Sequence, residues 1–453
     1  MGIAIRTAVR SARRLAIPGL ALAAFSSGCD SNSAPTAPAA ASVAANRSAF
    51  QASAAAKFSL QSVRAQRASD FVNSIGINTH LSYLSTMYGN FSLTKARLQT
   101  LGVKHLRDGG TVLNMDSWMR AVYGRMNDLH SALGITFNIA TLPGQGQGYY
   151  SKFNVRRLVS FLSPSAIESF EGLNERDDQD DGNWVSEERA WQKAMYGAVK
   201  GDESVRDKPV LGPSLVKRAS ASKLGSMEPW MDYANLHSYP GDSIPSAFID
   251  RNIALFAPEN GSKPRRLTET GYPTTPNSQF WVSEAVTGKY VPRLYLEYWN
   301  AGFSRSFIYQ LADEGSQGNG INGWGLLHSN GSPKSGYTAL ANFIGVLSDA
   351  GDGFEPGSLS YSIGGVPSTV HHALFQKSNG RYFLVLWNEV ASFNRHSHVL
   401  LNPAAVRTTL SLASNPKSVV LHEPTLGKSW STDASKSVAI DIPDHPLIVE
   451  IAF

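Results

Sequence analysis

"IESFEGLNE", residues 167–175, is an apolar segment that ends in the polar pair Asn174–Glu175. A second segment, "SEERAWQKAMYGAV", begins at Ser186 and has the spacing of an amphipathic helix, with two glutamates in its first turn, where the helix dipole favours anions. A short apolar run followed by a helical pattern predicts a β-strand connected to a helix. The same unit recurs along much of the chain.

Eight stretches have this strand character: Ser74–Leu81, Val103–Asp108, Ile135–Ala140, Ile167–Glu175, Pro209–Ser214, Asp232–Tyr239, Arg265–Tyr272 and Arg305–Asp313. Helical patterns lie between many of them, and two of these patterns stop at Gly102 and Gly134. Eight strand–helix units over roughly 280 residues match the size of a (β/α)8 TIM barrel, which we predict for residues 69–350. The alternative, a doubly wound open sheet, usually carries a glycine-rich phosphate turn after its first strand, whereas this chain has "NTHL" there.

The sequence after the barrel has a different texture. Helical patterns disappear, and segments such as "RYFLVLWNE", "TTLSLA" and "LIVEIAF" alternate with turn residues. Many short β-rich segments of this kind predict an antiparallel β-sandwich, which we place at residues 351–453.

The first residues have the features of a secretory signal. Four arginines precede an apolar run, Leu15–Phe25, that is too short to span a bilayer as a mature helix. The lone cysteine, Cys29, follows small residues in an arrangement that resembles a bacterial lipoprotein cleavage box, although a buried free thiol is the alternative. We predict a lipoprotein-type signal peptide at residues 1–28 and an Ala-, Ser- and Pro-rich tether at residues 29–68.

The predicted location is therefore outside the cytoplasm. The lipid on Cys29 would hold the protein at the cell envelope as a bacterial lipoprotein, and without that lipid the protein would be periplasmic or secreted. Subtracting the four arginines of the signal segment from the formal charge of +5 leaves +1 on the mature chain. A nearly neutral chain without a basic block argues against nucleic acid as a partner. We expect a monomer that touches the membrane only through its anchor.

Polar side chains gather where the predicted strands end. In a TIM barrel the loops after the strands build the active site, so these residues are candidates for catalysis and binding. They are Asn78, His80, Arg107, Asn174, Glu175, His237, Tyr239, Glu269 and Tyr309, together with Trp324 from the glycine-rich loop after the eighth strand. Trp324 is a candidate for stacking on a sugar face.

Two of these residues, Glu175 and Glu269, lie on the fourth and seventh strands, nearly opposite each other across the predicted mouth. Two carboxyl groups about 5 Å apart can cleave a glycosidic bond with retention, one as the proton donor and the other as the nucleophile. Arg107 and Tyr239 could keep Glu269 ionised, because a nearby cation or hydrogen-bond donor lowers a carboxyl pKa. Asn174 could hold a sugar hydroxyl group.

These motifs resemble glycoside hydrolase clan A, and most nearly its family 39 or an unassigned relative. The resemblance covers about residues 75–347 and rests on Asn174–Glu175, on Glu269 in "LTETGY" and on His237 and Tyr239 in a His-x-Tyr pattern. It implies a retaining hydrolase of β-type glycosidic bonds in an oligo- or polysaccharide, with Glu175 as acid/base and Glu269 as nucleophile. Such an enzyme needs no cofactor and no metal.

Other functions remain as alternatives. The chain could be a catalytically inactive carbohydrate-binding envelope lipoprotein, a structural envelope protein, or a barrel lyase or phosphodiesterase that uses a metal. The segment from Asp177 to Glu188 has the spacing of a calcium loop, with Gly182 at the sixth place, although Gln179 departs from the acidic or amide residue expected at the third. A solvated acidic loop is the preferred interpretation. The sequence contains no HExxH, CxxC or Walker motif.

Overall fold

The computed structural model describes residues 59–453, apart from 113–114, 145–146, 180, 277, 279, 316–322 and 352. The predicted signal segment, Cys29 and the tether up to residue 58 lie outside the described residues. Across the part that is described, we find no helix with both the length and the apolar character needed to cross a bilayer.

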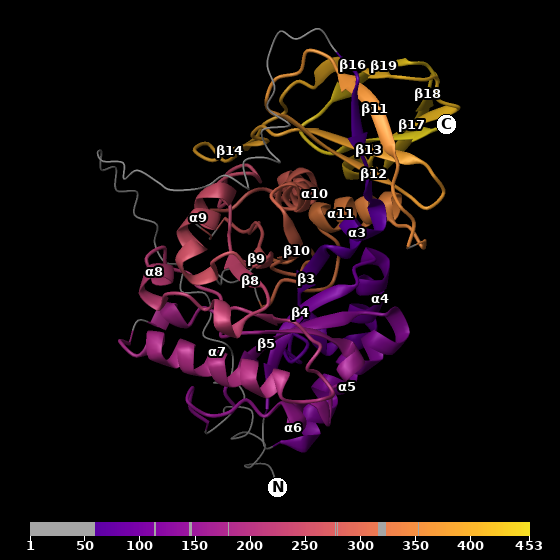
Figure 1. Cartoon of the computed structure of the whole chain (residues 1–453). Coiled ribbons are helices and arrows are strands. Elements are labelled where there is room, and N and C mark those ends of the chain that lie inside the picture. Colours follow the sequence, from indigo (N-terminus) through magenta and orange to yellow (C-terminus); the bar gives the residue numbers. More distant parts are fainter. Residues whose placement is uncertain are drawn as a thin grey trace, which may run out of the picture. The chain divides into compact units, whose positions relative to one another are not determined.

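Eight parallel strands form the central sheet of the molecule, and helices surround it (Figure 1). The strands are β3 (Ile75–Asn78), β4 (His105–Thr111), β5 (Thr136–Leu142), β6 (Ile167–Glu171), β7 (Val210–Leu211), β8 (Ala234–His237), β9 (Arg265–Thr270) and β10 (Phe303–Ile308). They follow the order β7-β6-β5-β4-β3-β10-β9-β8, and a parallel bridge between Leu211 and Tyr233 joins the two ends. The predicted TIM barrel is confirmed, and each strand overlaps its predicted stretch.

The helices of the barrel pack their apolar faces against these strands in one continuous core. They are α3 (Ala68–Asn73), α4 (Phe91–Leu101), α5 (Asp116–Leu133), α6 (Val155–Val159), α7 (Trp184–Lys200), α8 (Ser220–Leu224), α9 (Ile249–Asn260), α10 (Glu284–Asn300) and α11 (Ser335–Leu347). Gly102 ends α4 with a φ of 82°, a left-handed conformation that glycine adopts without steric cost. α7 begins at Trp184, two residues before Ser186, where the helical pattern of the sequence begins.

Two sheets, antiparallel except for the parallel pair β2–β12, form the predicted β-sandwich. One contains β1 (Gln61–Arg64), β11 (Ser358–Ile363), β16 (Val406–Leu412) and β19 (Ser437–Ile442). The other contains β2 (Gln66–Arg67), β12 (Val370–Gln376), β13 (Tyr382–Asn388), β17 (Ser418–Glu423), β18 (Lys428–Thr432) and β20 (Leu447–Ala452). A short hairpin, β14 (Phe393–Asn394) and β15 (Val399–Leu400), extends from this region. Apolar side chains of both sheets share one core.

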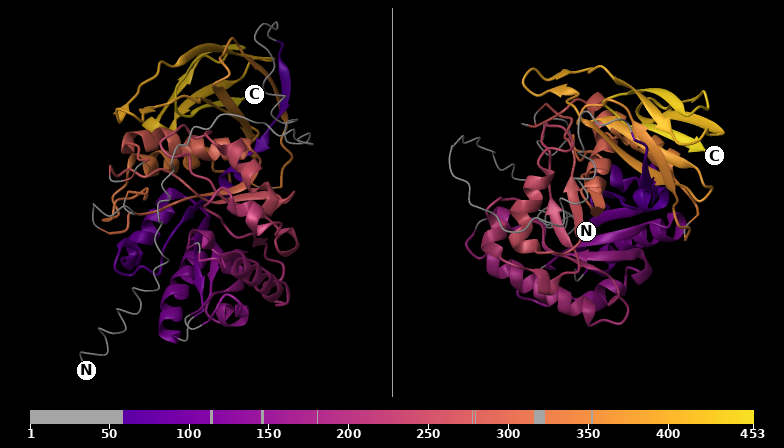
Figure 2. Two further views of the ribbon diagram at one scale, coloured as in Figure 1. Left: turned by 90° about the vertical axis from the view of Figure 1, so that its left-hand side faces the viewer. Right: turned by 45° about the horizontal axis from the view of Figure 1, so that its top comes forward.

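The sandwich is not built from the C-terminal sequence alone. Residues 61–67, which the composition assigned to the tether, form β1 and β2; Val63 pairs with Leu359, and Gln66 pairs in parallel with Phe375. In Figure 2 the indigo strand β1 accordingly lies among the orange strands that follow residue 350. An edge strand is held by backbone hydrogen bonds, which residues of any composition can make, so composition could not reveal it.

Buried polar contacts join α10 to the sandwich. The Arg293 guanidinium, fully buried, donates to Glu389 Oε2 at 2.7 Å and to the carbonyl oxygen of Asp444 at 2.9 Å. The carboxylate of Glu297, one turn later, accepts from the indole nitrogen of Trp387 at 2.7 Å. These charged groups have their partners across the contact, as buried ions require.

Candidate active site

The candidate site lies where the barrel strands end. Glu269 belongs to β9 and His237 is the last residue of β8, while Arg107 lies in β4. Glu175 follows β6 by four residues, after Asn174, which forms a parallel bridge with Ser214. Barrel closure brings these side chains to one end of the sheet, although they come from positions up to 162 residues apart.

Glu269 is surrounded by hydrogen-bond donors. Arg107 Nη1 donates to its Oε1 at 2.6 Å, and the Tyr239 hydroxyl donates to its Oε2 at 2.7 Å. Burial raises the pKa of Glu269, but the charges of His237 and Arg107 and the hydrogen bond from Tyr239 together hold it below its usual range. These contacts therefore favour the carboxylate form of Glu269, although the residue is only 3% exposed.

Glu175 has a different environment. Its backbone φ of 50° lies in the left-handed region, a conformation uncommon for a residue with a side chain and found at functional sites more often than elsewhere. His237 Nδ1 lies 2.6 Å from Glu175 Oε1. Burial raises the pKa of Glu175 and the charge of Glu269 raises it further, so that it lies above the usual range although His237 opposes both effects. Glu175 is the carboxyl group that holds its proton longer.

His237 connects the two acids. One carboxylate oxygen of Glu175, one of Glu269 and a ring nitrogen of His237 all lie within 4.8 Å of one another. The other ring nitrogen, Nε2, is 3.0 Å from the Thr268 hydroxyl. Burial lowers the pKa of His237, but the two carboxylates raise it above its usual value. Both ring nitrogens therefore face hydrogen-bonding groups, and the two neighbouring acids favour the charged imidazolium.

A buried polar layer beneath the mouth positions Arg107. Its guanidinium binds Glu171 through two hydrogen bonds of 2.8 Å, and Glu171 is fully buried. Arg107 also donates to Asn174 Oδ1 at 2.6 Å and to Asn78 Oδ1 at 2.9 Å. Planar, bidentate pairs of this kind fix the orientation of an arginine. Glu171 was not among the residues predicted from the sequence; it is the last residue of β6, which also contains Glu168 and Ser169.

Aromatic rings line one side of the site. The ring of Trp324 lies 5.1 Å from that of Tyr239 and 6.2 Å from that of Tyr309. Tyr309 in turn lies 5.6 Å from the ring of His80, which forms an ion pair with Glu314. A cis peptide bond joins Tyr309 to Gln310. All ten residues predicted from the sequence lie at this end of the barrel, and Glu314 is a further charged neighbour that the sequence analysis missed.

Comparison with known proteins agrees with this architecture. No family model matches the chain, and no curated protein matches it. Solved structures, in contrast, do match the chain. A family 39 glycoside hydrolase from Bacteroides cellulosilyticus is 14% identical and superposes with a TM-score of 0.56, covering 84% of this chain and 82% of its own. The chain shares its fold with family 39 glycoside hydrolases.

Two other solved structures superpose on this chain over nearly their whole length. A monomeric β-xylosidase from Caulobacter crescentus is 15% identical, has a TM-score of 0.57 and covers 86% of this chain and 98% of its own. An endo-β1,6-glucanase is 12% identical, with a TM-score of 0.51, and covers 88% of this chain and 96% of its own. These superpositions cover 86% and 88% of this chain, so the shared fold includes both the barrel and the sandwich.

The three groups Glu175, His237 and Glu269 could also surround a metal ion, since each offers a ligand atom. Arg107, however, already places its positive charge 2.6 Å from Glu269. A second cation beside that guanidinium would be repelled, and His237 Nδ1 faces Glu175 rather than an open position. The geometry suits a carboxylate pair better than a metal centre.

In the described residues of the segment 177–188, the contacts of Asp177 and Asp181 do not fit a calcium loop. Asp177 accepts hydrogen bonds from the backbone nitrogens of Val216 and Lys217, and Asp181 pairs with Arg176. Asp177 is also buried, so the expectation of a fully solvated loop is wrong at that residue. Sequence spacing could not show that these oxygens bind protein groups instead of a cation.

Glu188 is the most unusual acid of this segment. It is fully buried in α7, and so is Glu259 in α9. Within the described part of the chain, none of their four carboxylate oxygens has a hydrogen-bond partner. Burial raises the pKa of both groups well above the usual range; Glu259 adds to the shift at Glu188, and Asp177 adds to both. These two carboxyl groups are therefore held in the neutral form.

Proposed function

We propose that this protein is a retaining glycosidase that hydrolyses a β-type glycosidic bond in an oligo- or polysaccharide. One observation carries the proposal: the carboxyl groups of Glu175 and Glu269 approach within 4.8 Å, and their pKa values are shifted in opposite directions. A separation of about 5 Å suits double displacement, whereas inversion needs roughly 6.5–9.5 Å for a water molecule. The fold shared with family 39 glycoside hydrolases supports the same chemistry.

In the first step, a carboxylate oxygen of Glu269 attacks the anomeric carbon of the sugar. The bond from that carbon to the leaving oxygen breaks, and Glu175 gives its proton to the leaving oxygen. The products of this step are a glycosyl ester on Glu269 and a free alcohol. The raised pKa of Glu175 favours the protonated form that can donate, and the lowered pKa of Glu269 favours the ionised nucleophile.

In the second step, water replaces the leaving alcohol. Glu175, now a carboxylate, accepts a proton from the water. The water oxygen attacks the anomeric carbon, and the ester bond to Glu269 breaks. His237 lies 2.6 Å from Glu175 and 3.6 Å from Glu269. The positive charge of His237 is close to both acids, so it can stabilise Glu269 in the first step and Glu175 in the second.

The neighbouring residues position the sugar and the nucleophile. Asn174 uses its Oδ1 to accept from Arg107, which leaves its amide nitrogen to donate to a sugar hydroxyl. Arg107 and Tyr239 each hold one oxygen of Glu269. Trp324 and Tyr309 are the aromatic side chains on this side of the site, and we assign to them the apolar contact with the sugar ring.

The decisive experiment follows hydrolysis of a panel of 4-nitrophenyl β-glycosides, with the anomeric configuration of the first-formed sugar read by proton NMR. We expect hydrolysis of at least one glycoside with the β-anomer as first product. An α-anomer as the first product would replace retention by inversion. Oligosaccharide binding without hydrolysis of any glycoside would establish the alternative of an inactive carbohydrate-binding lipoprotein.

The proposal extends to the location of the enzyme. An exported lipoprotein anchored through Cys29 would meet a polysaccharide outside the cytoplasm, where a glycosidase finds its substrate. Radiolabelled palmitate should be incorporated into the wild-type protein and not into Cys29→Ser. Labelling of neither protein would mean a periplasmic or secreted enzyme instead.

A further inference from the structure

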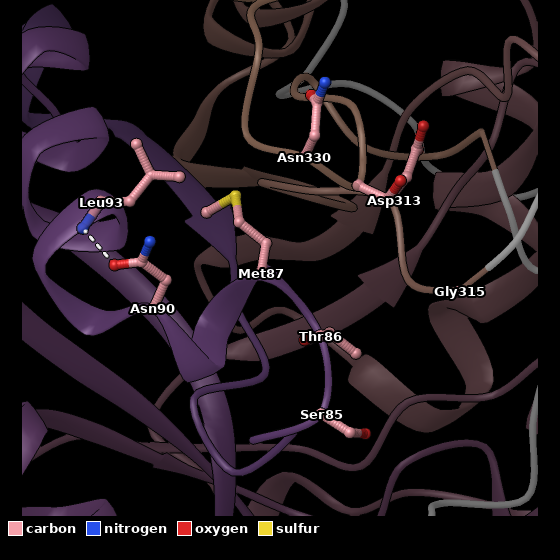
Figure 3. A pocket seen from close by; sticks show the side chains of 9 residues that line it. Ser85, Thr86, Met87, Asn90, Leu93, Asp313, Gly315 and Asn330 are labelled. Carbon is pink, nitrogen blue, oxygen red and sulfur yellow. Dashed lines mark hydrogen bonds between the residues drawn. The ribbon is translucent and has the colours of Figure 1, made fainter.

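A cavity of about 350 Å³ opens beside the candidate active site, between the loop that follows β3 and the loops that follow β10 (Figure 3). A volume of this size is within the range of small-molecule sites. We propose that this cavity binds a second sugar residue on the glycone side of the cleaved bond, so that the enzyme recognises at least a disaccharide unit there. The inference rests on the proposed glycosidase function and names the substrate more closely.

The lining of the cavity has the chemistry of a sugar site. Met87 and Leu93 give it an apolar floor, and Met87 is only 5% exposed. Exposed polar side chains stand at its rim, among them those of Ser85, Asn90 and Asn330. Figure 3 shows Asn90 and Leu93 on one side, Asp313 and Asn330 on the other, and Met87 between them. A sugar ring presents apolar C–H faces and polar edges, which match this combination.

The rim offers hydrogen-bond donors that the protein itself does not use. Asn90 accepts from the backbone nitrogen of Leu93, and Asn330 accepts from Ser332, in both cases through Oδ1. Among the described residues, neither amide nitrogen donates to a protein group, so both can bind hydroxyl oxygens. Of the described residues that line the cavity, Asp313 alone is charged, and Lys334 pairs with it at 2.7 Å. The cavity therefore suits a neutral, polyhydroxylated ligand.

A continuous row of side chains links the cavity to the nucleophile. Glu314 lies between the lining residues Asp313 and Gly315 and pairs with His80. From His80 the row runs through Tyr309 and Trp324 to Tyr239, which donates to Glu269. A sugar chain that passes along this row would extend from the sugar attacked by Glu269 toward the cavity.

The strand order decides on which side of the bond the cavity lies. Glu175 protonates the leaving oxygen in the proposed mechanism, so the leaving group departs on the side of β6. In the closed ring of eight strands, β10 is the fourth strand from β6 in either direction, and β3 is its neighbour. The cavity beside β3 and β10 is therefore across the barrel from the leaving group, on the glycone side.

The test compares 4-nitrophenyl β-xyloside with 4-nitrophenyl β-xylobioside, and the corresponding pair of glucosides, on the wild type and on Ser329→Trp and Ser85→Trp. Both serines are exposed residues of the lining, and neither side chain makes a hydrogen bond within the described part of the chain. The tryptophans should fill the cavity. Ser329→Ala is the matched control, because it removes the hydroxyl without adding bulk.

We expect the wild type to prefer the bioside in kcat/KM by about tenfold or more, and each tryptophan variant to lose that preference while hydrolysing the monoside within about twofold of the wild type. Equal use of both substrates by the wild type, or an unchanged preference in both tryptophan variants, would overturn the second sugar site and leave the glycosidase proposal intact. Failure of the wild type on every glycoside would refute the glycosidase proposal and this inference with it.

Discussion

Glutamate, arginine and histidine meet at both ends of the barrel, with opposite results. At the base, where the strands begin, Glu168 contacts His105 Nδ1 and Arg266 Nη1, each at 2.7 Å, and also Arg305. Burial opposes ionisation, yet Arg305, His105 and Arg266 hold the pKa of Glu168 at about 2. One acid with two arginines is strongly held in the ionised form, which suits a structural role.

At the mouth the cations are shared. Arg107 binds both Glu171 and Glu269, and His237 lies between Glu175 and Glu269. The cations therefore cannot stabilise every carboxylate equally, and Glu175 is left with a raised pKa beside Glu269 with a lowered one. The same residue types thus build a fixed ion cluster at the base and an acid–nucleophile pair at the mouth, and the ratio of acids to cations makes the difference.

The largest effect should come from removing the nucleophile at the mouth. Glu269→Ala is expected to lower kcat on a 4-nitrophenyl glycoside by about 10⁴-fold or more, because no ester intermediate can form. Added azide should restore part of the rate by attacking the sugar in place of Glu269. Glu168→Gln is the matched control from the base and should keep the wild-type kcat per folded molecule. A fully active Glu269→Ala variant would show that the acids at the mouth do not carry out the reaction.

Removal of the acid at the mouth should have an effect that depends on the leaving group. Glu175→Ala is expected to lower kcat/KM by about 10²–10⁴-fold on a glycoside with a poor leaving group. The loss should be much smaller with 2,4-dinitrophenyl glycosides, whose leaving oxygen needs no proton. An equal loss on both substrates would show that Glu175 supports the structure and does not supply the proton.

A change at the base should affect stability instead of catalysis. Glu168→Gln leaves Arg266 and Arg305 buried without their anion, which is expected to lower the free energy of unfolding by about 3–5 kcal/mol. Urea denaturation followed by tryptophan fluorescence measures the loss. A stability within error of the wild type would mean that water replaces the carboxylate, and the contrast between base and mouth would then rest on catalysis alone.

Glu188 and Glu259 extend the comparison to carboxyl groups that have no donors. Their raised pKa values mean that the folded protein binds these protons more tightly than the unfolded chain. The free energy of unfolding is therefore highest below the unfolded pKa of about 4.5. As the pH rises above that value, the free energy of unfolding falls by up to about 1.4 kcal/mol per pH unit for each group.

Glu188→Gln should flatten this dependence and raise the free energy of unfolding by about 1 kcal/mol or more at pH 8. The measurement is urea denaturation of variant and wild type at pH 5, 6.5 and 8. Glu187→Gln, at the adjacent position but with its carboxylate paired to Arg176, serves as the control and should not flatten the profile. Parallel profiles for Glu188→Gln and the wild type would show that the buried acids are neutralised in some other way.

Much of the fold could be predicted because strands and helices carry their own local signals. The apolar run at residues 167–175 and the helical spacing from residue 186 are properties of adjacent residues, and eight such units imply a closed barrel. A barrel places its site at the strand ends, so Glu175 and Glu269 could be predicted to meet without any knowledge of side-chain contacts.

Contacts between distant residues could not be predicted in this way. Nothing local to Glu171 indicates that it would bind Arg107, 64 residues earlier, or that β1 would pair with a strand almost 300 residues later. Both follow from barrel closure and from the packing of the sandwich.

The sequence by itself determined the order of the elements, the eight-strand barrel and the two acids at its mouth, because periodicity and strand-end polarity are written in neighbouring residues. Only the tertiary structure decided which acid keeps its proton. That depends on how many cations and donors reach each carboxyl group. Arg107 comes from β4, and His237 and Tyr239 come from the end of β8. A pKa is set by distances through space, and those distances exist only in the folded protein.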